Sequence, residues 1–148
     1  MSFLSAGFPP YPQTPVFIGK ADVEKAMAAK QPLIDNRPPD FFVGLSKSSA
    51  AKTAGTLPGA VNVPEAWLTE NNGGRFRSRQ QLAQLYAAAG VPTTGPQVNF
   101  CNTGHWASLG WFVAHEILGN KEAVMYDGSM AEWTQDPKAP VEVKIKLQ

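Results

Sequence analysis

Residues 97–108 read QVNFCNTGHWAS and place the only cysteine of the chain between two different sequence patterns. Residues 98–101 have the pattern of a short buried strand, and residues from about 105 to 118 that of a helix, with Gly119 as its stop. We therefore expect Cys101 at the last position of a strand, directly before a tight loop and a helix. Gly104 allows that loop the unusual backbone angles that a sharp turn needs.

The predicted loop has the features of a site that activates a thiol. A helix N-terminus leaves unpaired N–H groups, which stabilise a nearby anion such as a thiolate. The amides of residues 102–107 could form a ring of donors around a sulfur anion on Cys101. A single cysteine at a strand end is, however, more often a small buried hydrophobic residue than a nucleophile. The strand–loop–helix context leaves both interpretations open.

The rest of the chain repeats the alternation of strands and helices. This alternation predicts an α/β fold with a mostly parallel sheet of about five strands and helices on both faces. In such a sheet, ligands bind at the carboxyl ends of the strands, where Cys101 is expected. The expected strands are residues 16–18, 32–35, 60–63, 98–101 and 123–126, and the expected helices are 22–29, 78–89, 105–118 and a short one through Trp133.

Two segments carry a capping-box pattern, in which a serine precedes Glu or Gln by three residues. Ser78 and Gln81 predict the start of the 78–89 helix, and Ser129 and Glu132 that of the short last helix. The helix at 105–118 is apolar nearly all round, which predicts burial on two sides.

Length and charge set further bounds. The chain has 148 residues, with 13 basic and 12 acidic side chains and a net charge of +1. We expect a proline-rich linker at residues 1–15, a single domain at 16–148, and no nucleic acid or membrane partner. The first residues do not have the pattern of a signal peptide. Two locations therefore stay open. The protein would be cytoplasmic, or it would be periplasmic if the sequence is a piece of a longer exported protein.

Four segments, taken together, carry a family resemblance over about residues 16–140. They are LIDNR at 33–37, AGTLPGAVNVP at 54–64, the loop at 100–107, and VMYDGS at 124–129 with Glu132 and Trp133 after it. On these segments the chain resembles the rhodanese (sulfurtransferase) domain family. It is most similar to the catalytic C-terminal domain of two-domain thiosulfate or 3-mercaptopyruvate sulfurtransferases.

The resemblance implies a rhodanese-like three-layer fold and a sulfurtransferase without cofactor or metal. Cys101 would take a sulfane sulfur from a donor as a persulfide and pass it to a thiol or cyanide. The donor would be thiosulfate, 3-mercaptopyruvate or another persulfide. The active-site loop that would bind the substrate and hold the persulfide comprises Asn102, Thr103, Gly104, His105, Trp106 and Ala107.

Several positions depart from the family pattern. Asn102 and Thr103 are neutral, where members that use thiosulfate generally place cationic residues, and Phe41 stands where a donor-binding arginine is usual. His105 could supply a positive charge or a hydrogen bond to the donor, or it could simply face solvent. Trp106 could form a wall of the pocket, or it could only pack the helix start. These departures put turnover of thiosulfate in doubt.

Other motif residues have structural interpretations. Asp35 and Arg37 are expected to pair and to tie down a strand end. Asp127 is expected to act similarly or to orient the loop. Thr56 replaces the usual histidine of its motif, and His115 is expected to be a structural or surface residue.

Two rival functions can be weighed. A phosphatase of the related cell-cycle type needs an arginine six residues after the cysteine, and that position is Ala107. The surviving alternative is a persulfide carrier or regulatory module that acts with a partner protein and turns over small donors slowly. The expected partners are therefore a small sulfur donor and a thiol acceptor, with a preceding non-catalytic rhodanese domain or a protein persulfide partner as further candidates.

Overall fold

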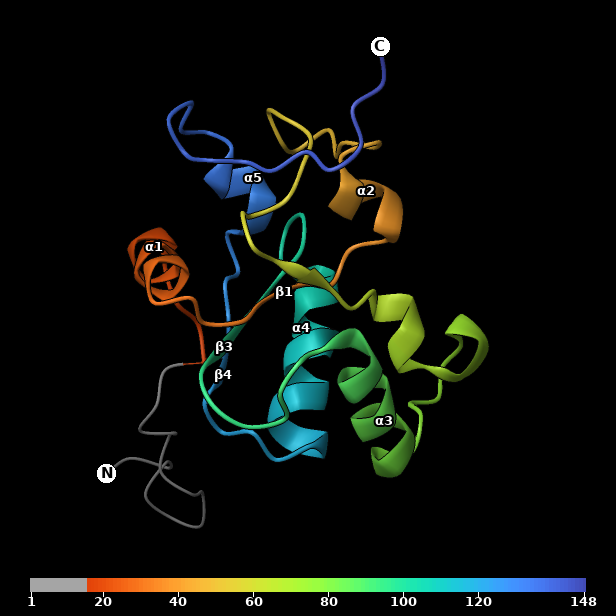
Figure 1. Cartoon of the computed structure of the whole chain (residues 1–148). Coiled ribbons are helices and arrows are strands. Elements are labelled where there is room, and N and C mark those ends of the chain that lie inside the picture. Colours follow the sequence, from red (N-terminus) through yellow and green to blue (C-terminus); the bar gives the residue numbers. More distant parts are fainter. Residues whose placement is uncertain (1–15) are drawn as a thin grey trace, which may run out of the picture.

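The computed structural model describes residues 16–148 and contains one parallel sheet with the strand order β2-β1-β3-β4 (Figure 1). In the described residues each strand pair is parallel, with Ile34 opposite both Val61 and Asn99, and Asn99 opposite Met125. The strands are β1 (Leu33–Asp35), β2 (Val61–Asn62), β3 (Gln97–Phe100) and β4 (Ala123–Met125). The predicted linker at residues 1–15 lies outside the described residues.

The strand expected at residues 16–18 is reduced to a single bridge. Phe17 pairs in parallel with Met125, Ile18 N–H donates to the Met125 carbonyl, and Met125 N–H donates to the Val16 carbonyl. The described sheet therefore has four strands and an edge bridge, close to the expected five.

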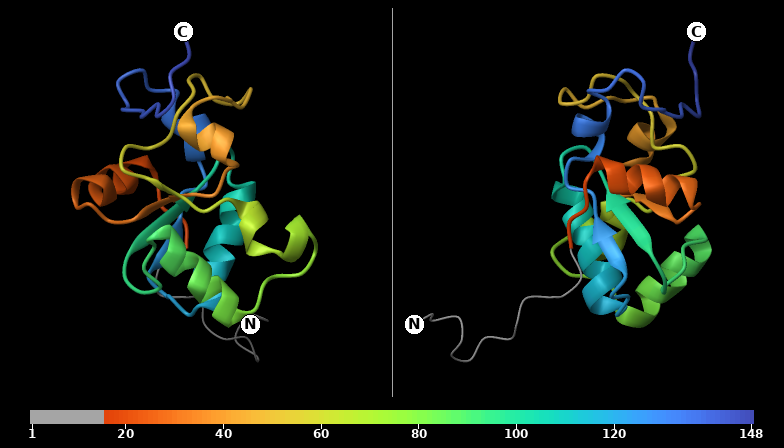
Figure 2. Two further views of the ribbon diagram at one scale, coloured as in Figure 1. Left: turned by 45° about the vertical axis from the view of Figure 1, so that its right-hand side comes forward. Right: turned by 90° about the vertical axis from the view of Figure 1, so that its left-hand side faces the viewer.

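Helices cover both faces of this sheet, as predicted. Figure 1 shows α1 on one side, with α3 and α4 on the other, and in the right-hand view of Figure 2 the β3 and β4 arrows both point upward. No helix among the described residues is long and apolar enough to cross a membrane. The helices are α1 (Lys20–Ala28), α2 (Pro39–Val43), η2 (Glu65–Leu68), η3 (Glu70–Asn72), α3 (Arg79–Ala89), α4 (His105–Phe112), η4 (Val113–Ile117) and α5 (Ser129–Trp133).

The alternation of side chains along the strands divides the core in two. Leu33 and Phe100 pack with Val23 of α1 and Trp133 of α5 in one cluster. Ile34 faces the opposite way, into a second cluster with residues of α3 and of the α4 segment. Side chains therefore cover both faces of the sheet. This packing holds in place the strand ends that carry the site.

The start of α3 confirms its predicted capping box. Ser78 Oγ accepts from the Gln81 N–H at 3.2 Å, and Gln81 Oε1 accepts from the Ser78 N–H at 3.1 Å. Gly90 ends the helix in the left-handed conformation with φ 74°. Both ends of this helix are set by local chemistry, and both could be read from the sequence.

The helix that follows the cysteine loop differs from its prediction in its regularity. Regular α-helix ends at Phe112 and continues as the π-helical η4, where the Leu118 N–H donates to the Val113 carbonyl. The expected burial on two sides is confirmed, because the helix packs on the sheet beside Met125 and on its other side shares a cluster with residues of η2 and α3. Only a narrow stripe that includes Ser108, Phe112 and Glu116 stays exposed.

Candidate active site

Cys101 lies at the carboxyl end of the sheet, directly after β3. The strand ends at Phe100, one residue earlier than predicted, and the Asn36 N–H after β1 donates to the Phe100 carbonyl at 2.9 Å. The Cys101 side chain is almost fully buried and packs with Ala107 and Met125. The ends of β1 and β3 therefore bring the aspartate-x-arginine segment and the cysteine loop together.

The backbone of Gly104 contacts the sulfur. Its N–H donates to Cys101 Sγ at 3.0 Å, and Gly104 is also the N-cap residue of α4. This N–H and the start of the helix both favour a negative charge on sulfur. Gly104 has φ 99°, and a Cβ there would overlap with Asp127 Oδ1. Asp127 is exposed and lies beside the Gly104 backbone, and its role in orienting the loop stays a prediction.

Ser129 is a site residue that the sequence reasoning missed. Its Oγ accepts from the Cys101 N–H at 3.0 Å, donates to the Tyr126 carbonyl at 2.9 Å, and lies 4.0 Å from Cys101 Sγ. Ser129 is fully buried and has φ 53°, a strained angle for a residue other than glycine. The only available signal was its place in the segment YDGS after an expected strand.

The capping box predicted at Ser129 and Glu132 is wrong. The helix α5 has Gly128 as its N-cap residue and no side-chain cap. Glu132 Oε1 instead accepts from the Tyr126 hydroxyl at 2.7 Å, and burial followed by this hydrogen bond raises the pKa of Tyr126 above its ordinary value. The serine is used to hold the cysteine loop, so it is unavailable as a cap.

The first amides of α5 hold the loop from its other side. The Met130 N–H donates to the Cys101 carbonyl at 3.1 Å, and the Ala131 N–H donates to the Asn102 carbonyl at 2.9 Å. Two helix N-termini thus bind this loop, α4 at the sulfur and α5 at the backbone carbonyls. The Gly104 donor to Sγ is one of the amides that the sequence predicted, whereas the sequence did not reveal the α5 contacts to the loop carbonyls.

Asp35 and Arg37 form a buried ion pair beside the loop. Arg37 Nη2 lies 2.7 Å from Asp35 Oδ2 and donates to the Gly55 carbonyl at 2.8 Å, while the Thr56 hydroxyl donates to Asp35 at 2.8 Å. Arg37 Nη1 also donates to Asn102 Oδ1 at 3.3 Å. The guanidinium group is committed to these partners, so it braces the loop rather than offering a free cation to a donor.

A pocket of about 260 Å³ opens beside the cysteine, and no lysine or arginine is among the described residues that line it. Ser48, which comes from the irregular segment after α2 and was not predicted, belongs to this lining. The remaining lining residues are Cys101, Asn102, Thr103, His105 and Trp106. The side chains that line the pocket are therefore polar and aromatic, and His105 is the only residue of a basic type among them.

An aromatic contact supports one side of this pocket. Trp106 is half-buried and meets Phe41 edge to face with ring centroids 6.2 Å apart. The Arg37 guanidinium carbon lies 5.9 Å from the centre of the Phe41 ring. Trp106 thus lines the pocket and also packs the helix start, so both interpretations of this residue apply.

The structure separates Ala107 and His115 from the pocket, whereas Thr103 and His105 line it. Ala107 is fully buried behind the loop and contacts no open space. His115 stacks on Trp111 with ring centroids 4.6 Å apart and bonds to Glu116 at 3.0 Å, on the η4 segment. Thr103 and His105 are exposed at the mouth of the pocket.

This arrangement of a β3–Cys101–loop–α4 unit beside a buried Asp35–Arg37 pair agrees with a family comparison. The model of the rhodanese-like domain matches residues 20–136. The chain belongs to the rhodanese-like family. The matched range runs from the start of α1 to the segment just after α5, so it includes the whole site.

Curated relatives of this rhodanese-like chain carry the name "Putative thiosulfate sulfurtransferase". A Haloferax volcanii protein is 40% identical over 126 residues, which are 82% of this chain and 44% of that protein. A Mycobacterium tuberculosis H37Rv protein is 38% identical over 118 residues, 75% of this chain and 42% of that protein. The rhodanese-like chain spans less than half the length of these relatives.

Solved structures share the fold. The anaerobic ergothioneine biosynthesis enzyme from Chlorobium limicola matches with a TM-score of 0.81 at 21% identity, over 94% of this chain and 35% of that chain. The wild-type structure of EanB matches with a TM-score of 0.80, again at 21% identity. At this identity the likeness shows the rhodanese-like fold alone.

Proposed function

We infer that the protein is a sulfurtransferase in which the Cys101 thiolate carries a sulfane sulfur as a persulfide. The observation that carries this proposal is the hydrogen bond from the Gly104 N–H to Cys101 Sγ, at 3.0 Å and at the first turn of α4. The family and the names of the relatives support the same class of reaction. EanB, which has the same fold, is recorded with a cysteine persulfide.

The proposed reaction has two nucleophilic steps. The thiolate attacks the outer sulfur of the donor, a new S–S bond forms, and the old bond to that sulfur breaks. Its electron pair leaves with sulfite from thiosulfate, or with pyruvate enolate from 3-mercaptopyruvate, which then takes up a proton. Cyanide or a thiolate next attacks the outer sulfur and releases the Cys101 thiolate. Neither step needs an external oxidant or reductant, because cyanide leaves as thiocyanate and a thiolate leaves as a new persulfide.

The charges around the pocket bear on the choice of donor. Thiosulfate is a dianion, and no lysine or arginine lines the described pocket to balance it. Arg37 is the nearest cation of the motif, but Asp35 neutralises it at 2.7 Å. We therefore expect a donor of lower charge, such as 3-mercaptopyruvate or an organic persulfide, to react faster than thiosulfate.

The test is formation of thiocyanate from cyanide with each donor supplied separately. The proposal predicts turnover that depends on Cys101, ping-pong kinetics, and a higher kcat/KM with 3-mercaptopyruvate than with thiosulfate. The Cys101→Ser variant is the control and should be inactive with both donors. A variant as active as the wild type would overturn the role of Cys101, whereas a preference for thiosulfate would overturn only the donor assignment.

A persulfide carrier that serves a partner protein is the second candidate. The absence of lysine and arginine from the described pocket lining favours it. It predicts that Cys101 takes up sulfur from a low-molecular-weight persulfide but turns over slowly with cyanide. Rapid steady-state turnover with a small donor would contradict it.

A further inference from the structure

Three of the four arginines of the chain lie within five residues, outside the cysteine pocket. They are Arg75, Arg77 and Arg79, and Arg77 bonds to the carbonyl of the exposed Trp67 of η2. We call these four residues the arginine patch. None of them lines the pocket beside Cys101, and the proposed sulfur transfer does not use them.

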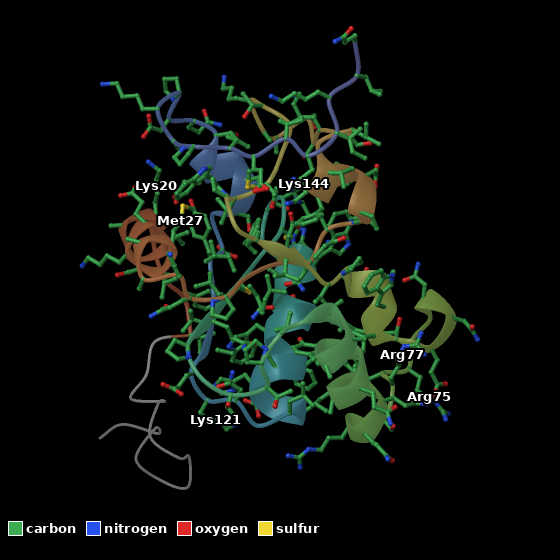
Figure 3. All side chains as sticks on the ribbon, in the orientation of Figure 1. Lys20, Met27, Arg75, Arg77, Lys121 and Lys144 are labelled. Atoms are coloured by element: carbon green, nitrogen blue, oxygen red, sulfur yellow. The ribbon has the colours of Figure 1, made fainter. Side chains whose placement is uncertain are left out.

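Local backbone pairing brings the segment of Trp67 beside that of Arg75 and Arg77, and Arg79 follows at the start of α3. Segments 67–70 and 75–77 run antiparallel, with a bridge between Thr69 and Phe76. The Arg77 N–H donates to the Leu68 carbonyl at 3.1 Å, and Arg77 Nε donates to the Trp67 carbonyl at 2.7 Å. Figure 3 shows Arg75 and Arg77 together at the outer edge of the molecule, beside η3.

The arginines of the patch form no ion pair with a carboxylate in the part of the chain that the structure describes. None of the ion pairs among residues 16–148 includes Arg75, Arg77 or Arg79. Residues 1–15 contain no aspartate or glutamate, so no carboxylate side chain there could pair with them. The nearest acidic residues along the chain, Glu65 and Glu70, form no ion pair in the described structure. By contrast, Lys20, Lys121 and Lys144, which are also labelled in Figure 3, each form an ion pair with a carboxylate.

Exposed aromatic surface accompanies these charges. Trp67 is 44% exposed, and Phe112 is 40% exposed while stacked on Phe76 with ring centroids 5.5 Å apart. Tryptophan, phenylalanine and arginine are the residue types enriched in protein–protein interfaces, and tryptophan and arginine dominate their binding energy. The combination points to a protein partner.

We propose that the arginine patch binds an acidic segment of a partner protein, with Trp67 as the apolar anchor. Arginine binds carboxylates with two parallel hydrogen bonds, which suits closely spaced aspartates and glutamates. Nucleic acid fits less well, because the net charge is +1, only three cations gather here, and the exposed Phe112 ring is stacked on Phe76. This partner site does not depend on the proposed sulfur transfer, and its test measures binding alone.

The experiment selects peptides from a random phage-displayed library on the purified protein. The most enriched peptide is then synthesised with a fluorescent label, and its affinity is measured by anisotropy. The test variant is Arg75→Glu/Arg77→Glu/Arg79→Glu, and the matched control is Lys25→Glu/Lys52→Glu/Lys138→Glu, which makes the same charge change at exposed lysines elsewhere. Because Arg77 bonds to the Trp67 carbonyl, Arg75→Glu/Arg79→Glu is a second variant that preserves this contact.

The proposal predicts that enriched peptides contain several acidic residues next to an apolar one. It predicts a loss of affinity of tenfold or more in the triple arginine variant, a smaller loss in the double variant and in Trp67→Ala, and little change in the lysine control. Peptides without acidic enrichment, or an affinity equal in the arginine and lysine variants, would overturn it. Tighter binding of a labelled single-stranded RNA, lost in the same arginine variants, would overturn it in favour of nucleic acid.

Discussion

The backbone N–H of Gly104 donates at 3.0 Å to the sulfur of Cys101, three residues earlier in the chain. The contact exists because Gly104 adopts φ 99° and because Asp127 packs where a side chain at this position would lie. It couples the geometry of the turn to the charge on the sulfur.

Gly104→Ala tests this coupling. A left-handed alanine costs about 1–2 kcal/mol, and its Cβ would also overlap with Asp127 Oδ1. We expect a loss of stability of more than about 2 kcal/mol in urea unfolding and a fall of at least about tenfold in the rate of alkylation of Cys101. Gly95→Ala is the control, because Gly95 has φ 89° but open space around it. Equal effects of the two variants on alkylation would contradict the account.

Ser129 supports a second prediction. It concerns the strained backbone angle of this residue, whose buried hydroxyl accepts a hydrogen bond. Ser129→Ala leaves the Cys101 N–H without its acceptor, which costs about 1–3 kcal/mol for a buried group. Ser129→Gly loses the same hydrogen bond but relieves the left-handed strain of φ 53°. We expect Ser129→Gly to unfold at a higher urea concentration than Ser129→Ala. The opposite order would show that the angle is not strained.

The buried ion pair gives a third prediction. Arg37→Met leaves the Asp35 carboxylate buried without its partner, and such a loss costs about 3–5 kcal/mol. Asp35→Asn/Arg37→Met removes both charges and should be less destabilised than Arg37→Met alone. Denaturant unfolding measures both, with Arg79→Met as the control at an exposed arginine. A double variant less stable than Arg37→Met would refute the argument.

A fourth prediction concerns the loss of stability at low pH. Lys20 Nζ bonds to Asp136 Oδ2 at 2.8 Å, and this hydrogen bond lowers the pKa of Asp136 below its ordinary value of 3.8. The native carboxyl binds its proton less tightly than the unfolded one. The stabilisation is therefore present above the ordinary pKa and is lost as the pH falls through the lowered native pKa.

Lys20→Met should therefore reduce the loss of stability between about pH 6 and about pH 3. The measurement is the urea midpoint at both pH values. Lys25→Met, on the same helix, is the control, since Lys25 forms no ion pair in the described structure. An unchanged difference between the two pH values in Lys20→Met would contradict the assignment.

Local signals account for the parts of the fold that could be predicted. The α3 helix carries both of its caps within its own sequence, and the strand before Cys101 is marked by apolar residues and a glycine loop. These features were enough to place Cys101 at the carboxyl end of a parallel sheet. The family motifs added the pairing of Asp35 with Arg37, which the structure contains.

The missed features depend on contacts between distant segments. Ser129 has the spacing of a capping residue, but its hydroxyl bonds to Cys101, 28 residues earlier. Ser48 reaches the pocket from an irregular segment that has no periodicity to read. The helix α2 was also missed, although Pro39 at its first turn and the left-handed Gly44 at its end are recognisable signals.

The most direct test of the account is the intact mass of the purified protein after incubation with 3-mercaptopyruvate or thiosulfate. Peptide mapping would then locate any added sulfur, and cyanide would be used to remove it. The account predicts a gain of one sulfur atom on Cys101, reversed by cyanide and absent in Cys101→Ser. Added sulfur that persists in Cys101→Ser, or no gain with either donor or with a low-molecular-weight persulfide while Cys101 still reacts with iodoacetamide, would contradict it.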